Sequence, residues 1–185
     1  MTDSTTEDML HLFSQSTLKS VDLLFKANLY GQLLVVVYST VDTLGLLHAP
    51  STQVSASGPS FKTYASAYLL PGSALECSAV DLWSARCAVL HSYSSESDLT
   101  RSGTAKEIQY YTGDKSTEHA RRFVELTKVV DGGRSIAVHI SDLLVAFLQS
   151  LQTQAAPLIH RCGTDPLVEI RVKNVLQVYP MDLVF

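Results

Sequence analysis

Apolar residues recur at helical spacing over the first seventy residues of the chain. The first set predicts a helix from about Glu7 to Asn28 with one apolar stripe. Its members are Leu10, Phe13, Leu18, Val21, Leu24 and Phe25. The next segment, about Gln32 to His48, is apolar on almost every side, which is typical of a helix in the middle of a core. The run FKTYASAYLL predicts a third helix, which ends before Pro71.

A fourth helix is predicted over Ser73–Ser94. Ser73 and Glu76 have the spacing of a capping box, and Pro71-Gly72 interrupts the chain just before them. Four helices joined by modest loops predict an antiparallel, up-and-down bundle of four or five helices.

The pattern of periodicity changes in the second half of the chain. Lys106–Thr112 and Arg134–Ile140 are rich in β-forming residues and predict strands. A helix is predicted between them, from Thr117 to about Lys128, and Asp131-Gly132-Gly133 closes it.

Two further elements are predicted near the end of the chain. Ser141 has the position of an N-cap for a helix that runs up to Pro157. Beyond it, Val168, Ile170 and Val172 alternate with charged residues, which predicts a strand.

The elements together predict a mainly α (α+β) fold with a small appended β-sheet in a single domain over residues 1–185. The helical bundle core is expected over 7–94 and a mixed α/β extension over 95–185. A hydrophobic content of 46% in 185 residues is enough for one sizeable core.

Composition and charge narrow the function classes. The net charge of −4 gives no general attraction to polyanions, so a nucleic-acid contact needs a local basic patch. The candidates for such a patch are Lys106, Arg121, Arg122, Lys128 and Arg134. The three cysteines form neither an even set nor a CxxC motif, and the acidic N-terminal segment has no signal-peptide core. We therefore expect a cytoplasmic protein without a membrane span, a metal or another cofactor.

Arg86 and His91 are the candidate chemistry of the fourth helix, because both lie on ridges otherwise made of core-type residues. A guanidinium keeps its proton, so at such a position it needs an acidic partner or a wet cleft. The acids best placed to reach it are Asp42, in an otherwise apolar run, and Asp22. Five helical positions put Arg86 and His91 about 140° apart around an ideal helix. They meet only if the helix loosens, if the arginine reaches across, or if two subunits share the site.

The segment RCAVLH, which begins at Arg86, resembles the Rx4-6H motif of the HEPN superfamily, whose members are small helical bundles that often dimerise. The wider stretch VDLWSARCAVLHSYSSESDLTRSGTAKEI is similar to bacterial HEPN-like proteins. The resemblance implies a homodimer that cuts RNA without a metal, with Arg86 at the phosphate and His91 as general acid or base. Asp42 is then a possible orienting partner, and Arg101 in the loop DLTRSG a possible phosphate contact.

Three alternatives stay open. Active HEPN nucleases usually place Asn, Asp or His after the arginine, whereas this chain has Cys87, so a catalytically silent HEPN-like interaction module is the second interpretation. Cys87 and His91 are four residues apart and would permit a thiolate pair. The same spacing recurs in Arg134–His139, but on a predicted strand, where residues five apart face opposite sides.

Overall fold

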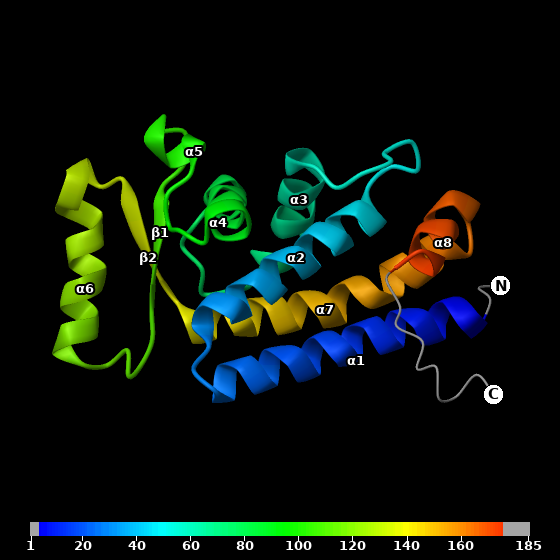
Figure 1. Cartoon of the computed structure of the whole chain (residues 1–185), viewed down its shortest axis with the longest axis horizontal. Coiled ribbons are helices and arrows are strands. Elements are labelled where there is room, and N and C mark those ends of the chain that lie inside the picture. The colour runs from blue at the N-terminus through cyan, green and yellow to red at the C-terminus, as the bar shows by residue number, and fades with distance from the viewer. Residues whose placement is uncertain (1–3, 176–185) are drawn as a thin grey trace.

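Helices make up most of the chain, and a single pair of strands lies at one end of the molecule (Figure 1). The computed structural model describes residues 4–175. The helices are α1 Ser4–Lys26, α2 Tyr30–His48, α3 Gly58–Tyr64, α4 Ala79–Ser92, α5 Asp98–Arg101, α6 Glu118–Val129, α7 Ile140–Cys162 and α8 Pro166–Lys173. A π-helical segment, η1 Ala65–Leu69, continues α3, and a 3₁₀ turn, η2 Val130–Gly132, continues α6. The strands are β1 Glu107–Tyr111 and β2 Ser135–His139. The predicted mainly helical class with a small sheet is confirmed.

The helix α2 lies at the centre of the molecule and contacts α1, α3, α4, α7 and α8. Figure 1 shows α1, α2 and α7 side by side along the length of the molecule. Burial of α2 explains why its sequence is apolar on nearly every side, since Val41 and Leu44 have no exposed surface. Among the described helices, α2 is the one long and apolar enough to cross a membrane, and more than half of that span is buried inside the protein. Core helices pass the same test.

The two strands pair in parallel, with Ile108 opposite Ile136 and Tyr111 opposite His139. A parallel pair requires a crossover connection, and α6 supplies it. α6 packs on β2, and the Phe123 ring on α6 lies 5.4 Å from the Tyr111 ring, centroid to centroid. The strands and the crossover helix were all predicted from the sequence, within a residue or two.

The start of the fourth helix was predicted too early. α4 begins at Ala79, and its capping box is formed by Ser78 and Asp81. Ser73 instead makes a turn, in which its hydroxyl donates to the Leu70 carbonyl at 2.8 Å. Asp81 also accepts from the Lys106 amide at 2.6 Å, which ties the start of α4 to the start of β1.

The helix α7 extends beyond both of its predicted ends. His139 provides the N-cap, since its side chain accepts from the Ser141 amide, and the helix continues through Pro157 to Cys162. Leu158 and Cys162 are buried beyond the proline, so their packing favours continuation of the helix.

The last predicted strand is a helix. Val168 and Val172 have no exposed surface and lie four residues apart on one helical face, whereas Ile170 is 51% exposed. Asp165 caps α8 by accepting from the Leu167 amide at 3.0 Å, and Pro166 occupies the first turn. Alternation over five residues did not distinguish an exposed isoleucine from a buried one, so the prediction was wrong.

The helical core includes residues from both halves of the chain. Phe147 in α7 and Val172 in α8 belong to the same hydrophobic cluster as Leu44 in α2. The core therefore extends beyond the 7–94 range expected from the sequence.

Candidate functional site

Asp42 and Arg86 form an ion pair between α2 and α4. The Arg86 Nε donates to Asp42 Oδ2 at 2.6 Å, and Nη2 contacts the same oxygen. The Arg86 side chain is 16% exposed and that of Asp42 is 11% exposed. Of the two acids expected to reach Arg86, Asp42 is the one that does, whereas Asp22 pairs with Lys26 on α1.

An aromatic ring supports the guanidinium from the side. The Arg86 Cζ lies 4.9 Å from the centroid of the Trp83 ring, within the range of a cation–π contact. Trp83 in turn packs on Phe61 of α3, with ring centroids 5.4 Å apart. The guanidinium is therefore fixed by an acid on α2 and an aromatic residue one turn earlier on α4.

The Asp42 carboxylate carries an unusual electrostatic load. Its Oδ1 is buried and has no hydrogen-bond partner among the described residues. Burial raises the pKa of Asp42 above its ordinary value, although the hydrogen bond and charge of Arg86 oppose this effect. The carboxylate thus depends on Arg86 to remain ionised in its buried position.

Arg86 and His91 are in contact. The Arg86 Nη1 lies 3.0 Å from the His91 Nε2 at the exposed side of α4. A guanidinium only donates hydrogen bonds, so Nε2 must accept, and the imidazole is neutral with its proton on Nδ1. The helix stays regular through Ser92, so it is the length of the arginine side chain that spans the expected angular separation.

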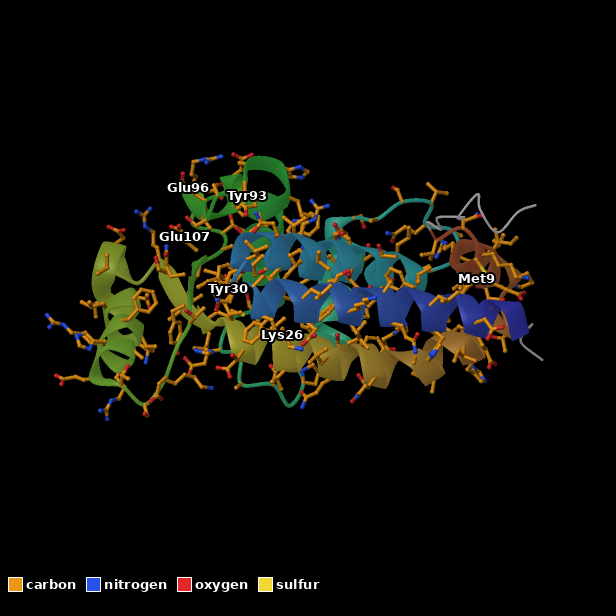
Figure 2. The ribbon with its side chains drawn as sticks, turned by 60° about the horizontal axis from the view of Figure 1, so that its bottom comes forward. Met9, Lys26, Tyr30, Tyr93, Glu96 and Glu107 are labelled. Atoms are coloured by element: carbon orange, nitrogen blue, oxygen red, sulfur yellow. The ribbon has the colours of Figure 1, made fainter. Side chains whose placement is uncertain are left out.

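The end of α4 leaves His91 accessible to solvent. The next residue but one, Tyr93, adopts a left-handed conformation with φ of 50° and ends the helix. Tyr93 is 60% exposed. Figure 2 shows Tyr93 and Glu96 close together at the end of the molecule that carries the sheet, far from Met9 on α1.

Arg101 lies on the same loop region but forms other pairs. Its guanidinium contacts Glu96 at 3.3 Å and also pairs with Asp98, both on the loop that follows α4. The structure brings Asp42, Arg86 and His91 into one connected cluster, and it engages Arg101 with acids outside that cluster.

The thiol alternative loses support from the surroundings of Cys87. Burial raises the pKa of the Cys87 thiol above its ordinary value, despite the nearby Arg86 charge. A thiol nucleophile requires the thiolate, so this environment disfavours it. Among residues 4–175, no group of three or more His, Cys, Asp or Glu is placed to hold a metal ion.

A second polar cluster, at the end of α2, was not predicted. His48 Nε2 lies 2.9 Å from Gln154 Oε1, the Tyr68 hydroxyl lies 3.4 Å from His48 Nδ1, and Arg161 donates to the His48 carbonyl. Tyr68, Gln154 and Arg161 are 20, 106 and 113 residues from His48 along the chain, so no local motif joins them.

Comparisons with protein-family models, curated proteins and solved structures found no match to this chain. The geometry of the Asp42, Arg86 and His91 cluster therefore carries the functional argument. It offers a fixed cation with one free arm beside an imidazole at the protein surface.

Proposed function

We propose that this chain is a HEPN-like protein with an up-and-down helical bundle, and that it cleaves RNA without a metal through Arg86 and His91. The observation that carries the proposal is the 3.0 Å contact between Arg86 Nη1 and His91 Nε2 at the exposed end of α4. It supports the proposal because a cation and a proton-transfer group must lie together to act on one phosphodiester.

The proposed reaction is the attack of a ribose 2′-hydroxyl on the adjacent phosphorus. His91 accepts the hydroxyl proton, the new oxygen–phosphorus bond forms a 2′,3′-cyclic phosphate, and the bond to the 5′-oxygen breaks. The leaving 5′-oxygen takes up a proton, for which the imidazole of a second copy of the chain is the proposed source. Arg86 binds the non-bridging phosphate oxygens as negative charge builds on them.

The contacts of Arg86 divide between holding and binding. Nε and Nη2 stay on Asp42, which fixes the plane of the guanidinium. Nη1 donates to His91 in the free protein. A phosphate that takes Nη1 releases His91 Nε2, so substrate binding itself exposes the base.

The second candidate is a catalytically silent, dimeric interaction module. It is favoured by the arrangement of Asp42 and Arg86, since two nitrogens of a guanidinium that is 16% exposed are bound to one buried acid. Buried ion pairs of this kind are often architectural. In this candidate, Arg86 holds α2 and α4 together and His91 has no role in chemistry.

The test is incubation of the purified protein with mixed RNA in EDTA, with detection of 2′,3′-cyclic phosphate ends. His91→Ala should lower the cleavage rate by about 100-fold or more, in line with the loss of a general acid or base. Arg86→Lys keeps the charge opposite Asp42 but removes the forked geometry, and it should also lower the rate strongly.

Matched controls separate chemistry from folding. His119→Ala removes an exposed histidine from α6 and should leave cleavage unchanged. Arg86→Ala leaves Asp42 uncompensated and should destabilise the fold by about 3–5 kcal/mol, so it is measured for unfolding and not for activity. Intact RNA with the wild-type protein, or equal cleavage by His91→Ala, would rule out the nuclease and leave the interaction module.

A further inference from the structure

A cavity of about 470 Å³ lies at the C-terminal end of α2, between that helix, the α3–η1 segment and α7. The lining residues do not include Asp42, Arg86 or His91, so the cavity is separate from the site described above. Its volume falls within the roughly 300–1,000 Å³ that small-molecule pockets occupy. More of its lining surface is apolar than polar.

Three aromatic rings form one wall of this cavity. The His48 ring lies 4.8 Å from the Tyr68 ring and 5.7 Å from the Tyr64 ring, and the two tyrosine rings are 5.2 Å apart. The planes are tilted by 39° to 50° to one another, so the rings form a faceted surface and not one flat stack. Such a wall favours a planar, conjugated ligand.

A hydrogen-bonded chain keeps this wall uncharged. Gln154 Oε1 only accepts, so the proton of His48 lies on Nε2, and His48 Nδ1 accepts from the Tyr68 hydroxyl. Burial lowers the pKa of His48, and the nearby Arg161 charge acts in the same direction. The imidazole is therefore neutral, and the Tyr68 oxygen keeps its lone pairs for a hydrogen-bond donor.

The backbone at the cavity departs from the ordinary helix. The Leu70 amide donates to the Ala65 carbonyl, five residues earlier, at 2.9 Å, so η1 is a π-helical segment. Tyr68 lies within it and lines the cavity. Short π-helical segments occur frequently at functional sites, because the extra residue redirects the side chains. This observation is independent of the cavity and points to the same place.

Arg161 is the single charged side chain among the residues that line the cavity. Its Nη1 donates to the His48 carbonyl at 2.5 Å and its Nη2 to the Ala49 carbonyl at 2.9 Å. These bonds use two of the five N–H groups of the guanidinium, so others are available to a ligand. Arg171 binds the same end of α2 through the Leu46 and Ala49 carbonyls, both at 3.1 Å, and adds a second positive charge nearby.

We propose that this cavity binds a small aromatic carboxylate, with its ring system against Tyr68, Tyr64 and His48 and its carboxylate on Arg161. The apolar, aromatic wall accounts for the ring, and a lone guanidinium with no acid in the lining accounts for the anionic group. The chemistry excludes a cationic aromatic ligand, which would meet Arg161 as a like charge.

The probe for this site is 2-naphthoate, titrated into the full-length protein by calorimetry and by NMR. Saturable binding is expected, with nuclear Overhauser contacts between the naphthyl protons and the tyrosine rings of the cavity. Tyr68→Ala and Arg161→Gln should each weaken binding by about tenfold or more, as expected for a lost ring contact and a lost charge-assisted hydrogen bond.

Controls address both the ring and the charge. Tyr111→Ala removes another part-exposed tyrosine whose ring lies 4.8 Å from a histidine, His139, and it should leave binding unchanged. Arg161 also caps α2, so Arg161→Lys provides a variant that keeps the charge if Arg161→Gln fails to fold. Retained binding in Arg161→Lys supports the proposal. Trimethylphenylammonium should not compete.

Specific outcomes would overturn the proposal. They are absence of saturable binding at millimolar 2-naphthoate, unchanged affinity in Tyr68→Ala, or tighter binding of trimethylphenylammonium than of 2-naphthoate. None of them bears on the RNA-cleavage proposal, because His91 and Arg86 are not part of this cavity.

Discussion

At the scale of single residues, Arg86 illustrates how a permanent charge is accommodated against a hydrophobic core. Asp42 accepts from two of its nitrogens, Trp83 lies beside it, and Nη1 extends to His91 at the surface. Removal of either partner leaves a desolvated charge behind, which costs more than the pair contributes.

His48 provides a prediction on pH and stability. Its pKa is lowered from 6.5 by burial, so the unfolded chain binds a proton before the folded protein does. The free energy of unfolding should therefore fall as the pH drops below about 6.5, with a slope of at most about 1.4 kcal/mol per pH unit from this residue. His48→Gln should lose this part of the slope.

The measurement is urea unfolding of both proteins between about pH 7.5 and about pH 5. His160→Gln serves as the control, because His160 is exposed on α7 and should not alter the slope. An identical pH profile in wild type and His48→Gln would contradict the assignment of a neutral, buried imidazole.

The residue scale also shows what a sequence can reveal about a site. An arginine on an apolar helix and an aspartate in an apolar run each violate a local pattern, so Asp42 and Arg86 were identified before any coordinates. His48, Tyr68 and Arg161 violate no such pattern, because each is ordinary for its own segment. Their cluster exists only through tertiary packing.

At the scale of elements, helix ends are decided by local hydrogen bonds that compete along the sequence. Both Ser73 and Ser78 stand three residues before an acid, and the sequence does not distinguish their spacing. In the structure Ser78 and Asp81 form the reciprocal pair, and Asp81 also binds the Lys106 amide. The additional partner in β1 explains why the second candidate is selected.

Substitution of the two serines tests this choice of helix start. Ser78→Ala should lower the free energy of unfolding by about 1 kcal/mol, the usual cost of a lost N-cap. Ser73→Ala removes only turn hydrogen bonds and should cost less than about 0.5 kcal/mol. Denaturant unfolding of both variants measures the difference, and an equal or larger effect at Ser73 would place the start of the helix there.

Most elements follow from periodicity, and the exceptions have identifiable causes. α1, α2, α6 and both strands match their predicted ranges closely. α8 was mistaken for a strand because Ile170, an exposed residue, completed an apparent alternation with two valines that are buried. α7 was cut at Pro157 because the packing of Leu158 and Cys162 beyond it is not visible in a local window.

At the scale of the whole molecule, the face around the end of α4 is the one that we propose for a homodimer. His91 and Tyr93 are exposed there, and the proposed reaction requires a second imidazole from another copy. A twofold contact brings the same residue from both copies close together, so a charge introduced near the axis repels itself.

Sedimentation equilibrium should therefore give twice the mass of the chain for the wild-type protein. Tyr93→Glu should weaken self-association by about tenfold or more, since like charges across an interface are costly. Leu12→Glu, on an exposed position of α1, should have no effect. A monomeric wild-type protein, or dissociation by Leu12→Glu alone, would exclude this face as the interface.

The position of α8 has a consequence for synthesis in the cell. Val172 completes the same hydrophobic cluster as Leu44 of α2, although 128 residues separate them along the chain. During translation, α2 leaves the ribosome long before the residues that cover it, so its apolar surface stays exposed on the nascent chain. Such a surface is a target for chaperones, and the protein should depend on them more than a fold built from contacts between neighbours.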